Sequence, residues 1–229
     1  MENTYKNFKE CYEEIAIKET NIIKKNQVGK IYGWSSVKWD HYHIGTSQIY
    51  YPIFINYLKE NNFNTFNTGI EFACGTTTIF DFIQVKEKKV SDLTTTHCNF
   101  MKNKGYNVTQ GNIEDKLFEE NYSDITSACG ILNFVINYDK AVHQLKRVTK
   151  NNGLILITVP FEQTITKVNI NSKGTGLALR DFNLNNLKER FEDYNFEIVF
   201  KYVQPQTDCP DRTGTKYISV LLLILKNIK

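Results

Sequence analysis

Short apolar runs alternate with helix-spaced apolar residues from about residue 68 to the end of the chain. Runs of about four to eight apolar or β-branched residues between polar turns predict strands, and apolar residues three or four positions apart predict helices. The expected strands span residues 68–72, 88–92, 107–110, 125–129, 154–159, 197–203 and 216–225. This alternation is typical of an α/β fold with a mostly parallel sheet and helices on both faces. The last two strands follow one another through a turn-rich segment, so we expect them to pair antiparallel at one edge.

The helices between these strands differ in how clearly they are marked. Residues 141–148 and 184–191 have apolar side chains at helical spacing. A further helix is expected directly after the small-residue turn at 73–75. His97 and His143 lie in the helices that follow the second and fourth strands. We expect both histidines to face away from the strand ends and to be structural.

Residues 1–62 follow a different pattern and are expected to form a helical cap or lid on a compact domain at 63–229. The spacing up to Lys30 fits one partly amphipathic helix, and helical spacing returns over 49–58. Between them lies a loop rich in glycine, tryptophan, tyrosine and histidine. Because loops often carry function, we expect residues 31–51 to fold over the strand ends when a ligand binds.

Composition and charge exclude several classes of protein. The chain has 229 residues, with 28 Lys and Arg against 25 Asp and Glu and a formal net charge of +3. This balance lacks the basic excess of a dedicated nucleic-acid binder, so a nucleic-acid partner is not expected. The five cysteines include no CxxC pair, which predicts reduced thiols and no metal site. No signal peptide or membrane span is predicted, so we expect a cytoplasmic protein without a membrane partner. The sequence predicts no particular oligomeric state.

The strongest functional signal is a small-residue turn followed by an acid. An apolar strand ends in Glu71 and Phe72 and leads into a turn of Ala73, Cys74 and Gly75. Asp92 ends the next predicted strand, 21 residues after Glu71. An acid at about this spacing is placed to accept hydrogen bonds from the hydroxyls of a ribose. The turn alone is also compatible with a strand-to-helix connection that binds nothing.

The carboxylate of Glu71 narrows the class of ligand. A negative charge beside this turn would repel the phosphates of a dinucleotide. The turn therefore suits a cationic or zwitterionic cofactor.

With these residues the chain resembles the class I S-adenosylmethionine-dependent methyltransferases. Residues 71–77 are similar to the family's acid, hydrophobic residue and GxGxG turn, with the middle glycine, Gly75, retained. Asp92 matches the acid of the second motif, residues 111–124 run in register with GDxxxLPFxxxxFD, and residues 131–160 are similar to RVLKPGGxLxxxxP. The resemblance implies a Rossmann-like methyltransferase fold with a seven-stranded sheet, and S-adenosylmethionine as the cofactor.

The resemblance also implies which residues contact the cofactor: Glu71, Ala73, Cys74, Gly75, Asp92, Leu93, Asn112, Ile113 and Cys129. Three positions depart from the family pattern. Ala73 and Thr77 replace the outer glycines, and Asn112 replaces the usual Asp beside the adenine. The histidine that family members often carry after the fourth strand is Phe134 here, so no catalytic role is carried over to it.

The acceptor is expected to lie between the aromatic loop and the long segment that follows the fifth predicted strand. His41 and His43 are the candidates for a general base, because histidine titrates near neutral pH. Either histidine could instead simply pack among the aromatic side chains of its loop. Arg180 offers a fork for a carboxylate or phosphate, and Lys173 and Glu162 lie in the same segment. We expect this excess of cations to favour an anionic acceptor.

These features predict methyl transfer from S-adenosylmethionine to a small polar or anionic metabolite. O-methylation of a sugar-, lipid- or phosphate-bearing intermediate is the expected reaction. Two alternatives are an RNA or protein methyltransferase of the same fold, and a catalytically degenerate, cofactor-free interaction module that keeps the fold.

Overall fold

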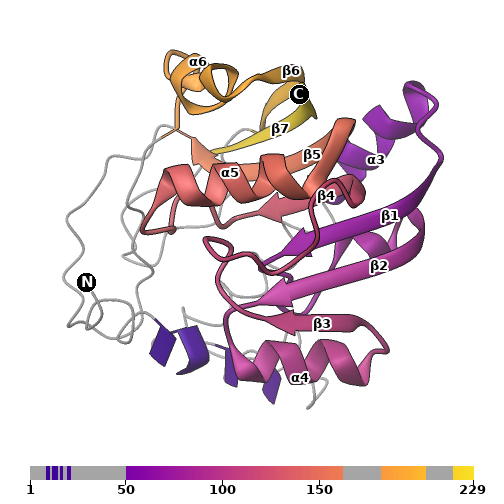
Figure 1. Ribbon diagram of the computed structural model, residues 1–229, viewed down its shortest axis with the longest axis vertical. Coiled ribbons are helices and arrows are strands. Elements are labelled where there is room, and N and C mark those ends of the chain that lie inside the picture. Colours follow the sequence, from indigo (N-terminus) through magenta and orange to yellow (C-terminus); the bar gives the residue numbers. More distant parts are fainter. Residues whose placement is uncertain are drawn as a thin grey trace.

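The computed structural model describes residues 50–161, 182–204 and 219–229. It also describes residues 9, 10, 12–14, 16, 17, 20 and 21, all of them helical, near the amino terminus. Figure 1 shows a central twisted sheet with helices in front of it and behind it.

The sheet has seven strands in the order β3-β2-β1-β4-β5-β7-β6. Their bounds are β1 Thr65–Phe72, β2 Gln84–Asp92, β3 Asn107–Gln110, β4 Ser123–Cys129, β5 Thr149–Phe161, β6 Phe196–Gln204 and β7 Ser219–Asn227. Strands β1 to β5 pair in parallel, whereas β7 runs antiparallel to both β5 and β6. The predicted α/β fold with a mostly parallel seven-stranded sheet is confirmed. The antiparallel pair forms one edge of the sheet, with β6 outermost.

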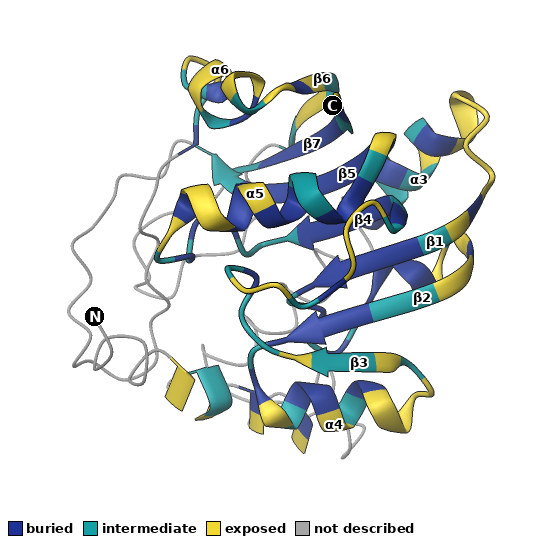
Figure 2. Ribbon diagram, viewed as in Figure 1, coloured by how far each residue is buried: buried dark blue, intermediate teal, exposed yellow. Residues whose placement is uncertain are grey.

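Helices cover both faces of the sheet. The described helices are α3 Tyr51–Glu60, α4 Thr95–Asn103, α5 Tyr138–Val148 and the short α6 Leu187–Arg190, with 3-10 turns η2 Ile79–Asp81 and η3 Glu192–Tyr194. One apolar core lies between the sheet and the helices α5 and α6, and a second lies between the sheet and α3 and α4. Consecutive residues of the central strands are therefore buried, and these strands are mostly dark blue in Figure 2.

The pattern of β7 explains why it is buried on both faces. Alternate side chains of a strand point to opposite faces of the sheet. The side chains of β7 divide accordingly between the two cores: Leu221, Leu223 and Leu225 on the α5 side, and Leu222 and Ile224 on the α3 side. All five are fully buried.

The helix expected after the glycine turn is absent, and that prediction is wrong. Strand β2 begins at Gln84, and the connection from β1 contains a single 3-10 turn, Ile79–Asp81. Three consecutive β-branched residues, 76–78, precede this turn, and β-branched residues disfavour helix. The α3 side of the sheet is filled here by Ile79 and Phe80 together with side chains of α3.

The helix predicted at 184–191 is shorter in the structure. Its α-helical part is Leu187–Arg190, and the chain continues into the 3-10 turn η3, Glu192–Tyr194. Residues 216–218 of the last predicted strand lie outside the described residues.

Candidate functional site

The glycine turn lies at the carboxyl end of β1 and is bent by two residues in the left-handed region. Ala73 and Gly75 both have φ of 55°. The N–H of Cys74 donates to the carbonyl of Ser91 over 3.0 Å, which ties the turn to β2. A Cβ on Gly75 would meet no described atom within 4 Å. The described residues therefore leave room beside the backbone at Gly75.

Glu71 is buried where β1, β4 and α3 meet. Its Oε1 accepts hydrogen bonds from the Tyr51 and Ser127 hydroxyls, both at 3.2 Å. Its Oε2 accepts from the Thr78 hydroxyl and from the N–H of Ile79. Burial raises the pKa of Glu71 to about 7, although these hydrogen bonds oppose the shift. Glu71 is thus an acid that holds together three elements at the strand ends.

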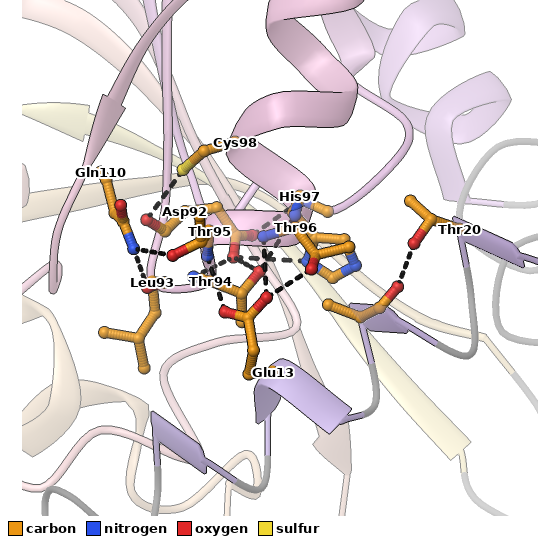
Figure 3. Close-up of polar contacts among 12 residues, drawn as sticks. Glu13, Thr20, Asp92, Leu93, Thr94, Thr95, Thr96, His97, Cys98 and Gln110 are labelled. Atoms are coloured by element: carbon orange, nitrogen blue, oxygen red, sulfur yellow. Dashed lines mark hydrogen bonds and ion pairs between the residues drawn. The ribbon is translucent and has the colours of Figure 1, made fainter.

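Asp92 ends β2 and is held by protein donors on both carboxylate oxygens (Figure 3). Oδ2 accepts from the N–H of Gly75 at 3.0 Å. Oδ1 accepts from the N–H and the hydroxyl of Thr94, at 2.9 and 2.8 Å. Burial acts to raise the pKa of Asp92, but hydrogen bonds from His97, Thr94 and Gly75 outweigh it and lower the pKa. Asp92 therefore joins the glycine turn to the start of α4.

His97 does not face away from this edge, and that prediction is wrong. The residue is buried in the first turn of α4, with Nδ1 3.3 Å from Oδ1 of Asp92. The first turn of a helix that follows a strand must lie beside the end of that strand. A position five residues after Asp92 was therefore the signal that could have placed His97 here. His143 is exposed on α5 against the ring of Tyr194, away from the strand ends.

An acid from the amino-terminal segment reaches the same place. Glu13 accepts hydrogen bonds from the N–H groups of Thr95 and Thr96, at 2.7 and 2.9 Å, and from the Thr96 hydroxyl. These are the first residues of α4, so Glu13 satisfies backbone donors that a helix leaves unpaired at its start. Figure 3 shows Glu13 opposite Asp92 across the start of α4. Nearby, the Tyr12 ring packs edge-on against Phe134, with centroids 6.2 Å apart.

The remaining predicted cofactor residues lie at the ends of neighbouring strands. The carbonyl of Leu93 accepts from Nε2 of Gln110 at 3.2 Å. Oδ1 of Asn112 accepts from the N–H of Glu114 at 3.1 Å and shapes the loop after β3. Ile113 is buried in the α5-side core.

Two cysteines complete this set. Cys129 ends β4, and burial raises the pKa of its thiol to about 12. Burial also raises the pKa of Cys74, helped by the charges of Asp92 and Glu71. Both thiols therefore stay protonated at neutral pH, which makes them poor nucleophiles.

The acceptor residues expected from the sequence, His41, His43 and Arg180, lie outside the described residues, as do Glu162 and Lys173. Within the described part of the chain, no group of three or more His, Cys, Asp or Glu side chains could hold a metal ion. The same part contains no helix that is long and apolar enough to cross a membrane.

Two features define the class of protein. The first is the strand order, in which an antiparallel β7 lies between β5 and β6. The second is the adjacency of a glycine turn after β1 and an acid at the end of β2. Together they describe a Rossmann-like methyltransferase fold with a ligand site at the carboxyl edge of the sheet.

Comparisons with known proteins agree with this class. Residues 70–157 match the family described as "Methyltransferase domain". A S-adenosylmethionine-dependent methyltransferase from Methanosarcina mazei has a TM-score of 0.60 at 15% identity, covering 77% of this chain and 97% of that chain. One from Clostridium acetobutylicum has a TM-score of 0.60 at 14% identity, covering 84% and 98%. The cyclase SpnF has a TM-score of 0.58 at 11% identity, covering 78% and 80%. No curated protein matches the sequence.

Residues 70–157 therefore match a methyltransferase domain, and the chain has the fold of S-adenosylmethionine-dependent methyltransferases, whose cofactor is S-adenosylmethionine. The described residues fit that cofactor in two respects. Among the described residues the backbone at Gly75 is open to a ligand, and the carboxylate of Asp92, whose pKa is lowered, suits a positively charged sulfonium and ammonium.

Proposed function

We propose that this protein transfers the methyl group of S-adenosylmethionine to a small polar or anionic metabolite. A hydroxyl oxygen of a sugar-, lipid- or phosphate-bearing intermediate is the proposed acceptor. The observation that carries the proposal is the meeting of Glu71, Gly75 and Asp92 at the ends of β1 and β2. It supports binding of a cationic nucleoside, because acids and an open backbone lie together there.

Each described residue has a part in holding the cofactor. Asp92 would accept from ribose hydroxyls, Gly75 would let the ligand lie against the backbone, and Glu71 would supply a favourable field from beneath the turn. Leu93, Asn112 and Ile113 would flank the adenine, and Cys129 would lie at the β4 side. The bound cofactor supplies an activated methyl group, so the protein chiefly orients the acceptor and excludes water.

The acceptor part of the proposal depends on the sequence outside the described residues. Arg180 would hold the anionic group of the acceptor. His41 or His43 would take the proton of a hydroxyl nucleophile. A small acceptor is favoured over RNA because the net charge is +3 and the sequence carries no Arg- and Lys-rich appendage. A reducing, cytoplasmic location is part of the proposal, and the described thiols of Cys74, Cys98 and Cys129 are free.

A second candidate function keeps the fold without methyl transfer. Two observations favour it. The carboxylate oxygens of Asp92 already make four polar contacts with protein groups. The helix expected after the glycine turn is replaced by a 3-10 turn. A carboxylate has about four lone-pair sites, so a ribose hydroxyl must displace one of these donors. The fold similarity to the [4+2]-cyclase SpnF illustrates a protein of this architecture that is named for another reaction.

Binding calorimetry with S-adenosylmethionine separates these candidates. The wild-type protein should bind the cofactor, and Asp92→Ala should weaken binding by roughly 10- to 100-fold, because a hydrogen bond to a charged group is lost. Glu197→Ala is the matched control: it removes an exposed acid on β6, which four other strands separate from β2 in the sheet order. If wild-type protein fails to bind, the non-transferase candidate replaces the proposal.

The acceptor class needs a second measurement. Wild-type protein is incubated with cell extract and methyl-labelled S-adenosylmethionine, and the products are separated by size. The proposal expects label among small molecules, and Arg180→Ala should reduce that label while leaving cofactor affinity unchanged. Label found only in RNA or protein would show a macromolecular acceptor instead.

A further inference from the structure

Among the residues that the structure describes, Asn133 is a buried amide with no hydrogen-bond partner. The residue is 0% exposed, and neither Nδ2 nor Oδ1 has a partner. Leaving a buried polar group unpaired costs about 1 to 3 kcal/mol, and buried polar atoms in proteins are nearly always paired. Two unpaired atoms on one side chain therefore indicate a partner that belongs to the working protein.

Asn133 lies in the loop that leaves the carboxyl end of β4. Strand β4 neighbours β1, and from this pair the sheet continues to β2 and β3 on one side and to β5 on the other. Ligands of open α/β sheets bind at this point, where the strand order reverses. The bond from the Ser127 hydroxyl to Glu71 joins β4 to β1 there. The loop of Asn133 therefore starts at the predicted cofactor site.

The loop is held at both ends, which fixes the position of Asn133. The N–H of Gly130 donates to the carbonyl of Thr158 at 2.8 Å. At the other end, Oε1 of Glu114 accepts from the N–H groups of Ile136 and Asn137, at 2.8 and 3.1 Å. A polar group on such an anchored segment is preorganised for a ligand.

Apolar neighbours make Asn133 a poor choice for folding alone. Leu132 and Val135 on either side belong to the α5-side core. The ring of Phe134 packs against the ring of Tyr12, so Tyr12 covers this part of the loop. An apolar side chain at 133 would fold with less cost than an unpaired amide.

The acidic side chains near the strand ends indicate which group of S-adenosylmethionine would need the amide of Asn133. Glu13, Glu71 and Asp92 receive all their described hydrogen bonds from hydroxyls, backbone N–H groups and His97. No Lys or Arg side chain is among these described donors. The ammonium and sulfonium of S-adenosylmethionine suit such an edge, whereas its carboxylate requires a neutral donor.

We propose that the amide of Asn133 binds the amino-acid end of S-adenosylmethionine. Its Oδ1 accepts from the ammonium and its Nδ2 donates to the carboxylate, so that both unpaired atoms gain partners of matching character. This assignment rests on the proposed function, because it requires that cofactor. It makes Asn133 the residue that distinguishes the whole cofactor from an adenosine without an amino-acid end.

The test compares two ligands by calorimetry: S-adenosylhomocysteine, which has the ammonium and carboxylate, and 5′-methylthioadenosine, which lacks both. Asn133→Leu keeps the branching of the side chain and removes its polar atoms. It should weaken S-adenosylhomocysteine binding by about 10- to 100-fold and change 5′-methylthioadenosine binding less than about 2-fold. It should also raise the thermal midpoint of the ligand-free protein, because two unpaired groups are removed.

Asn137→Leu is the matched control in the same loop. Asn137 is exposed, and its Oδ1 caps α5 by accepting from the N–H of Lys140 at 3.0 Å. The control should lower the thermal midpoint through the lost cap and leave both affinities unchanged. Asn133→Ala, which should show the same ligand selectivity, serves if the leucine variant does not fold.

The outcomes separate the two proposals. If wild-type protein binds S-adenosylhomocysteine but the Asn133 variants bind both ligands like wild type, or lose both equally, the assignment of Asn133 is wrong and the proposed function stands. If wild-type protein binds neither ligand nor S-adenosylmethionine, the proposed function fails, and the assignment of Asn133 fails with it.

Discussion

Glu71 should make the stability of this protein fall as the pH rises towards neutral. Its carboxyl group is buried at 2% exposure and is enclosed by donors from α3, β4 and the β1–β2 connection. Burial raises its pKa to about 7 from an ordinary value of 4.5. Glu71→Gln is the chosen perturbation, because glutamine has the shape of the protonated acid and does not titrate.

The sign of the effect follows from the direction of the shift. Between pH 4.5 and about 7 the folded protein retains a proton that the unfolded chain has released. The contribution of Glu71 is therefore fully present below pH 4.5 and is lost as the pH rises through about 7. At about 1.4 kcal/mol per pKa unit, the loss is on the order of 3 kcal/mol.

Urea denaturation at several pH values from 5 to 8 measures this loss. The free energy of unfolding of wild type, minus that of Glu71→Gln, should fall by about 2 to 3 kcal/mol over the range. Histidines also titrate there, but they are common to both proteins and cancel in the difference. Parallel curves for the two proteins would refute the reasoning. Glu119→Gln is the control, because a hydrogen bond from Lys89 lowers the pKa of Glu119, and this exposed acid is ionised throughout.

Two further predictions concern the turn and the amino-terminal segment. Ala73→Gly should stabilise the protein by up to about 1 kcal/mol in urea denaturation. A left-handed alanine costs about 1 to 2 kcal/mol, and the greater freedom of glycine in the unfolded chain offsets part of the gain. A clear loss of stability would contradict this. Glu13→Ala should speed hydrogen exchange at the amides of Thr95 and Thr96 by roughly 2- to 10-fold, because both amides donate to Glu13. Equal exchange rates in the variant and in wild type would show that this contact is not formed in solution.

The sheet could be predicted from sequence because its strands are buried on both faces. Such strands appear as continuous apolar runs between turns, as in residues 154–159 and 219–225. The common edge for Glu71, Gly75 and Asp92 was also predictable, because the carboxyl ends of parallel strands must lie together. Both predictions depend on short-range patterns combined with one rule of topology.

The connection between β1 and β2 was not predictable in the same way. A glycine turn after a strand usually leads into a helix, and the sequence at 76–83 is apolar enough to suggest one. Whether a helix forms there depends on the space left on that face of the sheet. In this chain α3, which precedes β1, packs with Ile79 and Phe80, and no helical spacing in 76–83 reveals that competition.

Hydrogen-bond partners were the least predictable part of the site. The acids Glu71 and Asp92 were expected as ligand contacts, yet both also hold the protein together. Asn133 gave no signal, because a single polar residue among apolar ones resembles any loop position until its burial and lack of partners are known. Such facts depend on three-dimensional neighbours, which sequence spacing does not contain.

Because no helix follows the glycine turn, Glu71 and Asp92 hold this turn in place in addition to their proposed contact with the cofactor. Where a helix follows the glycine turn, its own backbone hydrogen bonds hold the turn in place. Here the turn is held instead by the carboxylates of Asp92, which receives the N–H of Gly75, and Glu71, which receives the N–H of Ile79. Removing either acid therefore changes the turn as well as any ligand contact. A loss of cofactor affinity in such a variant identifies a ligand contact only if the ligand-free variant keeps its stability. Calorimetry on Asp92→Ala therefore needs urea unfolding of the ligand-free variant beside it.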